Sequence, residues 1–417
     1  MSLSPDPDLS NFIRPGDTIM WGQSHAEPRR LIRHLIDQRH KVARVRVFLG
    51  IGLSGQLRPE HADAFDFLAY GGGGTTHKLA PSGALDILPV HYSRLPHLVR
   101  FGTLRVDVMM LQVSPPDAEG RYSLGMAREY LTEPLRHARV ILVEVHPDIP
   151  WTHGGPYLTA NDIDLLITSD ENLTPETEST ITPVAEAVGR NAASLIEDGA
   201  TLQTGIGTIP DAIMAQLSDR RDLGVHTGSI GDGMAMLHRS GAVTNARKPV
   251  DPGLSIGGVL MGGAGLRAFA HRNPALELRG TEYTHDPMIL GQIANFVAVN
   301  SAVEVDLTGQ INSEVVGGRY VGAVGGIVDF LRAAGSVERG VPIVALPSTA
   351  RDRSRIVSKL SGPVSVPRAD SCVIVTEHGI ADLRGLTLRQ RIEIMIAIAH
   401  PEHRDSLERA AREDGEI

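Results

Sequence analysis

Short apolar runs alternate with amphipathic and polar segments along almost the whole chain. The runs are close to continuously apolar, which is the pattern of parallel strands covered on both faces of a sheet. In the first half of the chain we expect strands over 42–50, 106–113, 138–145 and 163–169. In the second half we expect them over 223–227, 294–305, 341–346 and 370–376.

Helix-like stretches separate several of these strands, for example 184–198 and 388–399. A chain that alternates strands with helices forms open α/β sheets with right-handed crossovers. Ligands of such sheets bind beyond the carboxyl ends of the strands. The pattern therefore predicts an α/β protein and directs attention to the loops that follow its strands.

Two distant segments repeat one local pattern. Residues 16–22 read GDTIMWG and residues 199–205 read GATLQTG, and a proline near the start of a helix-like stretch follows each of them. An internal repeat of roughly 185 residues is what two similar domains in tandem produce. We therefore expect two related open-sheet domains, 1–180 and 185–417, joined within the polar segment 173–186, which holds two prolines.

The most glycine-rich functional candidate is the stretch 304–330, EVDLTGQINSEVVGGRYVGAVGGIVDF. It reads as a strand, a polar loop and a helix that resumes at Ile327. Glycines allow close approach to a ligand, and N–H groups at a helix start can hold an anion or a carbonyl oxygen, although such turns also serve simple tight packing. With the loops 70–96, 111–125 and 203–212, it suggests one cleft between the two domains.

Composition narrows the function classes. Hydrophobic residues make up 42% of the chain and charged residues 21%, as in ordinary globular proteins, and the net charge of −9 argues against nucleic-acid binding. The single cysteine, Cys372, fits a reducing compartment and a buried strand thiol. We find no signal-peptide pattern, no membrane-spanning run and no metal-ligand spacing among the 17 histidines, so we expect a cytoplasmic, metal-free protein.

Several motifs together resemble one enzyme family. VDLTGQINSEVVGGRYVGAVGGIVDFLRAA, the segment 358–407, and the shorter motifs SPPDAEGRYSLG, ILPVHYSRLP and QTGIGTIPDA are similar to the acetyl-CoA hydrolase/transferase family. The resemblance covers nearly the whole chain. It implies two related CoA-transferase-type α/β domains and a homo-oligomer, most simply a dimer.

The resemblance also implies thioester chemistry. In the family a glutamate attacks an acyl-CoA, giving an acyl anhydride and then a glutamyl-CoA thioester, from which CoA passes to a carboxylate. Gly325 and Gly326 would donate backbone N–H groups to the oxyanion. Gln203, Gly205 and Gly207 match the other glycine turn that lines the coenzyme A site.

The chain departs from the family where the nucleophile is expected. The family segment resembles H-T-E-x-x-x-D-G, whereas residues 226–233 read HTGSIGDG, so Gly228 stands at the position of the glutamate. Asp232 would lie about one turn from Gly228 if a helix began near Ser229, and could replace the nucleophile or simply face the helix dipole. His226 could act as a general base or be a hydrogen-bonded strand-end residue.

Two further glutamates, Glu304 and Glu314, read as positional residues rather than nucleophiles. The basic run 350–359 offers side chains for the phosphates of coenzyme A, with a solvated face as the alternative. These side chains are Arg351, Arg353, Arg355 and Lys359, of which we favour Arg355.

We expect an enzyme that transfers CoA between an acyl-CoA and a small carboxylate. Because Gly228 has no side chain, we keep two alternatives. One is a hydrolase of thioesters or of carbon–carbon bonds that uses water, and the other is an inactive CoA-binding protein.

Overall fold

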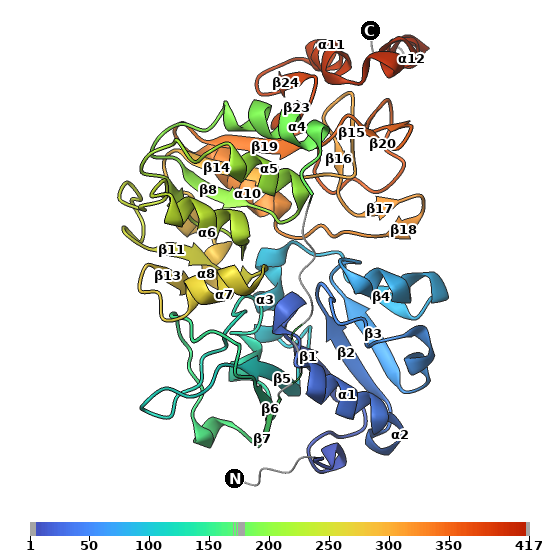
Figure 1. Ribbon diagram of the computed structural model, residues 1–417. Helices are drawn as coiled ribbons and strands as arrows, with labels where there is room; N and C mark the ends of the chain where they lie inside the picture. The colour runs from blue at the N-terminus through green and yellow to red at the C-terminus, as the bar shows by residue number, and fades with distance from the viewer. Residues whose placement is uncertain (1–5, 170, 172, 174–179, 414–417) are drawn as a thin grey trace. The chain divides into compact units, whose positions relative to one another are not determined.

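A computed structural model describes residues 6–169, 171, 173 and 180–413 and divides the chain into two compact units. Among the described residues, unit 1 holds those before 177 together with 256–284 and 319–325, and unit 2 holds the others (Figure 1). The predicted domains 1–180 and 185–417 did not anticipate that two later segments group with unit 1. The predicted junction at 173–186 lies partly outside the described residues.

Unit 1 is built on a seven-stranded sheet in the order β4-β3-β2-β1-β5-β6-β7, in which all neighbours are parallel. The strands are β1 (Thr18–Trp21), β2 (Val45–Leu49), β3 (Phe65–Ala69), β4 (Leu85–Ile87), β5 (Val108–Val113), β6 (Val140–Val145) and β7 (Leu165–Thr168). Its helices are α1 (Arg29–Asp37), α2 (Arg39–Val42), α3 (Leu95–Arg100), α7 (Ala264–Ala270) and α8 (Thr281–Thr284). The predicted α/β class is confirmed.

Unit 2 is built on a six-stranded sheet in the order β24-β23-β19-β14-β8-β9, in which only β24 is antiparallel to its neighbour. The strands are β8 (Thr201–Thr204), β9 (Gly224–Val225), β14 (Phe296–Asn300), β19 (Val341–Ala345), β23 (Val373–Thr376) and β24 (Gly379–Asp382). A smaller sheet joins β15 (Glu304–Asp306), β16 (Ile311–Asn312) and β22 (Ile356–Val357). The helices are α4 (Pro183–Ala193), α5 (Thr208–Ala215), α6 (Asp232–Arg239), α9 (Pro287–Leu290), α10 (Ile327–Ser336), α11 (Leu388–Ile398) and α12 (Pro401–Glu413).

The remaining short strands of the described chain are β10 (Ser229–Ile230), β11 (Ser255–Gly257), β12 (Val259–Leu260), β13 (Leu276–Leu278), β17 (Val315–Val316), β18 (Arg319–Tyr320), β20 (Thr349–Ala350) and β21 (Arg353–Ser354).

The two large sheets share one winding order, as the sequence repeat predicts. In unit 1 the strand β1 lies between β2 and β5, and β6 and β7 follow outward. In unit 2 the strand β8 lies between β9 and β14, and β19 and β23 follow outward. The repeated glycine segments therefore form the same strand of two related sheets. Unit 1 extends its sheet with β3 and β4, and unit 2 extends its sheet with β24.

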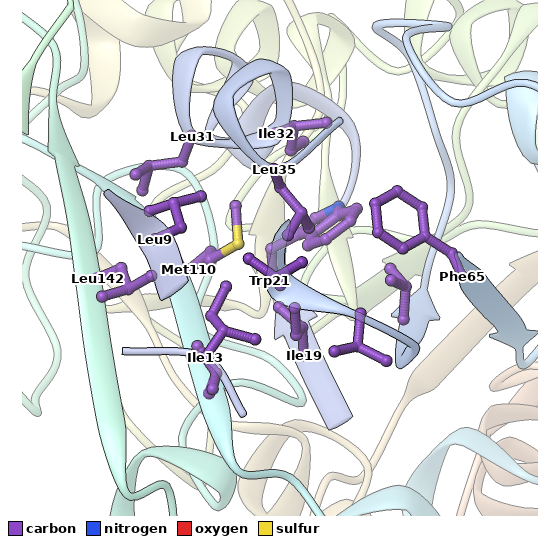
Figure 2. Packing of buried hydrophobic residues seen from close by; sticks show 14 of the residues in the cluster. Leu9, Ile13, Ile19, Trp21, Leu31, Ile32, Leu35, Phe65, Met110 and Leu142 are labelled. Atoms are coloured by element: carbon purple, nitrogen blue, oxygen red, sulfur yellow. The ribbon is translucent and has the colours of Figure 1, made fainter. Parts of the chain in front are cut away.

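The core of unit 1 lies between one face of the sheet and the helix α1. Leu31, Ile32 and Leu35 lie on one side of this helix and are buried against the sheet, where Figure 2 shows them above Ile19 and Trp21 of β1. Because side chains of a strand alternate between faces, Val47 and Leu49 join this core whereas Phe48 points to the opposite face. That second face carries the aromatic cluster described below.

The structure corrects one predicted strand and adds several. The apolar run 294–305 is not a single strand, because β14 ends at Asn300 and β15 begins at Glu304 in a different sheet. In the two large sheets, the strands β3, β4 and β24 were not predicted. Cys372 is fully buried, as expected, directly before β23. In the described part of the chain, no helix combines the length and the apolar character that crossing a membrane requires.

A buried carboxylate caps helix α1. Glu144 of β6 accepts hydrogen bonds through Oε2 from the backbone N–H groups of Arg30 (2.9 Å) and Leu31 (3.1 Å). These N–H groups belong to the first turn, which has no intrahelical partners for them. Burial raises the pKa of Glu144 from 4.5 to about 7, because a charged carboxylate is poorly solvated there.

We predict that the substitution Glu144→Gln changes how stability depends on pH. The raised pKa contributes stability that is fully present below about pH 4.5 and is lost as the pH rises through 7. The glutamine does not titrate, so the stability of the variant relative to the wild type should rise between pH 5 and pH 8, by on the order of 2–3 kcal/mol. Unfolding midpoints at both pH values measure this.

The control is Asp382→Asn. The pKa of Asp382 is lowered, mainly by its hydrogen bond with Arg384, so this carboxylate stays ionised between pH 5 and pH 8. The difference between Asp382→Asn and wild type should therefore be constant over that range. The same constant difference for Glu144→Gln would contradict the prediction.

Candidate active site

In unit 2 the loops after β8 and β9 are tied together at the carboxyl edge of the sheet. The Thr227 hydroxyl donates to the carbonyl oxygen of Thr204 (3.0 Å) and accepts from the Thr204 backbone N–H (3.3 Å). His226 donates its backbone N–H to the carbonyl of Leu202 (3.0 Å). Gly228, the predicted position of the missing nucleophile, directly follows this tied segment.

The imidazole of His285 lies between two of the predicted site glycines. A Cβ atom on Gly228 would lie 3.0 Å from His285 Cε1, and a Cβ atom on Gly326 would lie 2.6 Å from His285 Nε2. Phe330 of α10 lies behind the ring, with 4.4 Å between the ring centroids. The structure therefore brings Gly228 and Gly326 to one buried histidine that sequence reasoning did not identify.

This histidine is uncharged at neutral pH. Burial lowers the pKa of His285 to about 3, and the nearby His226 adds to the effect. Both side chains are buried, with 3% and 0% of their surface exposed. The site thus presents neutral imidazole rather than a cation next to the two glycines.

Gly325 and Gly326 lie at the start of helix α10, where the sequence predicted backbone donors. Gly326 is the residue before the first helical turn, and Gly325 has a φ of +55°, a left-handed conformation that favours glycine. In unit 1 the carbonyl of Gly325 accepts the backbone N–H of Tyr92 (2.9 Å).

Two of the predicted functional loops meet inside unit 1. Gly72 donates its backbone N–H to the carbonyl of Gly322 (2.8 Å), and a Cβ atom on Gly72 would lie 2.4 Å from the carbonyl oxygen of Tyr320. The four consecutive glycines thus permit close backbone packing. They bring the loop 70–96 against the segment 319–325.

Gln203, Gly205 and Gly207 occupy the end of β8 and the turn into α5. The amides of Gln203 and Asn300 pair, with Asn300 Nδ2 donating to Gln203 Oε1 (3.0 Å). Gly207 is exposed with a φ of +108° and no atom within 4 Å of a would-be Cβ atom. This turn is open enough to admit a ligand.

The structure does not support the geometry that we expected for Asp232. Ser229 and Ile230 are extended, and helix α6 begins only at Asp232, which is exposed. The premise that a helix beginning near Ser229 would bring this carboxylate beside Gly228 is therefore wrong. The carbonyl of Ser229 accepts the Thr227 hydroxyl (3.1 Å), which ties this extended segment to the loop after β9.

The four basic residues of the run 350–359 divide into two kinds. Arg351, Arg353 and Lys359 are exposed. Arg355 is half-buried and donates to the carbonyls of Ala302 and Val303, the latter at 2.7 Å. Its desolvation lowers its pKa. The guanidinium of Arg355 therefore holds the segment before β15, whereas the other three residues are exposed.

Glu304 and Glu314 are both buried and hydrogen-bonded, and their positional role stays a prediction from the sequence. Glu304 Oε1 accepts from Asn312 (3.0 Å) and from the backbone N–H of Ser361 (2.7 Å). Glu314 accepts from the Ser365 hydroxyl (2.6 Å). Both carboxylates join β-strands and loops of the smaller sheet.

Unit 1 contains a pocket beyond the carboxyl ends of β1 and β2. It is lined by Trp21, Gln23, Glu27, Ile32, Leu49, Gly50, Ile51, Gly52, Ser54, Gly55, Gln56, Leu57, Thr75, Thr76 and Leu79. Sequence reasoning missed Gln23 and Glu27, as it missed His285, because no spacing marks a side chain whose partners arrive from distant loops. Within the described ranges no three histidine, cysteine or acidic side chains are arranged to hold a metal ion.

The chain is similar in sequence to one family of known enzymes. Residues 4–178 match the acetyl-CoA hydrolase/transferase N-terminal domain, and residues 262–411 match the corresponding C-terminal domain. The chain is 38% identical to 4-hydroxybutyrate coenzyme A transferase of Clostridium kluyveri over 80% of this chain and 79% of that protein. It is 34% identical to succinyl-CoA:cyclohexane-1-carboxylate CoA transferase of Geobacter metallireducens, covering 97% and 94%.

A solved structure agrees over the same length. The crystal structure of RipA from Yersinia pestis superposes with a TM-score of 0.93 at 32% identity, covering 98% of this chain and 96% of that one.

We predict that Gly326→Ala destabilises the protein through a clash with His285. The φ of Gly326 is −92°, which any residue adopts, so the penalty is steric and should be about 1–3 kcal/mol. In a His285→Ala background the new methyl group has room, and the penalty should fall below about 1 kcal/mol. Denaturant unfolding of the four proteins measures this cycle.

Gly335→Ala provides the control in the same helix. A Cβ atom there would lie 4.0 Å from its nearest neighbour, so this change should be neutral or stabilising by about 0.5–1 kcal/mol. Equal penalties for Gly326→Ala with and without His285 would refute the clash.

Proposed function

Because this chain belongs to the acetyl-CoA hydrolase/transferase family, we propose that it acts on acyl-CoA thioesters and passes CoA to a small carboxylate. The observation that carries the proposal is the similarity to named CoA-transferases, which extends through both units. An open α/β sheet binds ligands beyond the carboxyl ends of its strands. The loops around Gly228 and Gly326 follow such strand ends or begin a helix in unit 2.

We assign Gly325 and Gly326 as donors to the thioester oxygen. Their backbone N–H groups precede the first turn of α10, where peptide dipoles favour a developing negative charge. The negative charge that forms on the oxygen when a nucleophile adds to the carbonyl carbon would be stabilised there. The absence of side chains on both glycines lets the thioester approach the backbone.

The transfer chemistry must proceed without a carboxylate at position 228. The acceptor carboxylate can itself add to the thioester carbonyl, which expels the CoA thiolate and forms a mixed anhydride. The thiolate then adds to the acceptor's carbonyl carbon and releases the first acid. Each bond that breaks is replaced by one that forms, and no group of the enzyme is acylated.

Hydrolysis is the second candidate, and it is supported by the glycine at position 228, which offers no carboxylate for the covalent route. A Cβ atom there would lie 3.0 Å from His285, so a side chain at this position would require a small shift of the ring. Water would add to the thioester carbonyl and give its proton to a base, for which we nominate His226. The CoA thiolate would leave as the acid forms.

We further assign Arg351, Arg353 and Lys359 to the phosphates of coenzyme A, supported by their exposure and charge. Gln203, Gly205 and Gly207 would line the same ligand, supported by the open turn after β8. Arg355 holds backbone carbonyls and is better assigned a structural role. The cytoplasmic location and the homo-oligomeric state stay predictions from the sequence.

We predict that Gly325→Ala lowers the turnover of acyl-CoA by about 10²-fold or more, because it disturbs an oxyanion donor. Gly317→Ala is the matched control, since both glycines have a φ of +55° and neither has a neighbour closer than 3.9 Å to a new Cβ atom. The two substitutions carry similar backbone strain. Equal turnover in the two variants would argue against the assigned donor.

We predict that the wild-type protein forms no glutamyl-CoA adduct during turnover. Gly228 cannot carry the covalent intermediate that the family route requires. Incubation with acyl-CoA, trapping with hydroxylamine or borohydride and peptide mass spectrometry test this. A modified glutamate or aspartate in the wild type would restore the covalent route and overturn the prediction.

The gain-of-function variant needs two changes. Gly228→Glu alone places its side chain against His285, so we expect the adduct in Gly228→Glu combined with His285→Ala. The single variant His285→Ala controls for the loss of the ring. Transfer to an added carboxylate, compared with release of free acid in its absence, separates the two candidate activities.

A further inference from the structure

A carboxyl group without a cationic partner is buried on the second face of the unit 1 sheet. Glu129 is 2% exposed, and its Oε2 accepts hydrogen bonds from Gln23 Nε2 (2.7 Å) and the Tyr92 hydroxyl (2.7 Å). Its Oε1 is buried without a hydrogen-bond partner. Among the described residues, no basic side chain forms an ion pair with it.

Aromatic rings surround this carboxyl group. Tyr70, Tyr92 and Tyr130 pack edge to face with centroids 5.2–6.4 Å apart, and Phe48 of β2 packs against Tyr130 at 5.8 Å. The Tyr70 hydroxyl donates to Gln23 Oε1 (2.6 Å) and the Tyr130 hydroxyl to the carbonyl of Trp21 (2.9 Å). Gln23, Tyr70, Tyr92 and Glu129 are therefore held in one hydrogen-bond network, and Tyr130 is held separately by Trp21.

The titratable groups that face Glu129 are these three tyrosines, and Glu27 acts on the cluster through Tyr130. Burial raises the pKa of each tyrosine, so all three stay neutral at physiological pH. Burial also raises the pKa of Glu129 to about 7, against the effect of its two hydrogen bonds. Glu129 is thus the group of this cluster that changes charge near neutral pH.

Tyr92 connects the carboxyl group to the predicted oxyanion turn. Its hydroxyl donates to Glu129, and its backbone N–H donates to the carbonyl of Gly325 (2.9 Å). His91 adds a parallel bridge to the same glycine. The backbone of Glu129 is also constrained, because its carbonyl oxygen accepts the backbone N–H of Thr281 (3.1 Å). Its φ is +23°, an uncommon conformation for a non-glycine residue that the surrounding structure must maintain.

We propose that Glu129 is a positioning residue that fixes the Gly325 turn through Tyr92, and that its ionised form holds the turn more firmly than its neutral form. The proposal rests on the function assigned above to Gly325. Hydrogen bonds to an ionised acceptor are roughly twice as strong as those to a neutral one. The donors on Tyr92 and Gln23 therefore bind the carboxylate more tightly than the acid, and the turn is better ordered above pH 7.

The first test compares wild type with Glu129→Gln across pH 6 to 8.5. The amide oxygen still accepts both hydrogen bonds, but the side chain cannot ionise. The two proteins should have similar kcat values at pH 6, and the wild type should be about 3-fold to 10-fold faster at pH 8.5. The KM for the acyl-CoA should not change, because the proposed effect of Glu129 reaches the Gly325 turn only through Tyr92. Parallel kcat profiles would overturn the proposal.

Glu144→Gln is the matched control. Glu144 is also buried and its pKa is also raised to about 7, but it caps helix α1, and within the described residues no hydrogen bond joins it to Gly325. This variant should retain the wild-type profile of kcat with pH. Tyr92→Phe cuts the link from the other end and should remove the same pH dependence, which keeps the proposal testable if Glu129→Gln does not fold.

Hydrogen exchange distinguishes a failed proposal from a failed function. The Tyr92 amide, which donates to Gly325, should exchange about 3-fold to 10-fold faster in Glu129→Gln than in wild type at pH 8.5, and at equal rates at pH 6. If the wild type turns over no acyl-CoA but the difference in exchange rate is found, the positioning role of Glu129 is supported and the function proposed for the protein is refuted. Equal exchange at both pH values overturns the positioning role whether or not the enzyme is active.

Discussion

The contact of the His285 ring with two glycines is the constraint on which the unit 2 site depends. Gly228 and Gly326 come from segments almost a hundred residues apart, and each approaches the ring so closely that a methyl group would need a shift. The histidine is neutral because its ring is buried. One buried ring therefore lies against two backbone segments, and a side chain at position 228 would have to displace it.

The turn at Gly325 depends on equally close backbone packing in unit 1. Gly72 donates to the carbonyl of Gly322, and a Cβ atom on Gly72 would lie 2.4 Å from the carbonyl oxygen of Tyr320, so this contact requires a glycine. The backbone N–H of Tyr92 binds the carbonyl of Gly325. A rigid donor costs little reorganisation when charge develops on a substrate oxygen. The glycines of the loop 70–96 are, in this fold, positions of tight backbone contact.

Periodicity and repetition predicted most of the architecture. The apolar runs became β2, β5, β6, β7, β19 and β23, and the matched segments at 16–22 and 199–205 became topologically equivalent strands. The failures share a cause. The run 294–305 is mostly apolar, but only tertiary pairing decides that its first half joins the large sheet and its last residues join the small one. Strand β4 has only three residues and β3 is interrupted by Asp66, so neither forms the continuous apolar run on which the prediction relied.

The site was less predictable for a related reason. Gly326 and Gly228 lie in recognisable motifs, so the sequence identified them, whereas His285, Gln23 and Glu129 have no motif and acquire meaning only through their neighbours. Arg355 shows the opposite error. It lies in a basic run that suggested phosphate binding, but its guanidinium donates to backbone carbonyls instead. A motif therefore identifies candidate residue types, and only the folded structure shows which side chains are free of other contacts.

The energetics of Glu129 point to a role beyond stability. Burying a carboxyl group among aromatic rings without a cation is unfavourable, and two hydrogen bonds offset only part of the desolvation. An apolar side chain of similar volume would serve the core at least as well. The carboxyl group instead organises the amide of Gln23 and the hydroxyl of Tyr92, both of which need a partner once buried. The cost of burying this carboxyl group is thus offset in part by the hydrogen bonds that it accepts from Gln23 and Tyr92. Through the backbone N–H of Tyr92, this network reaches the carbonyl of Gly325.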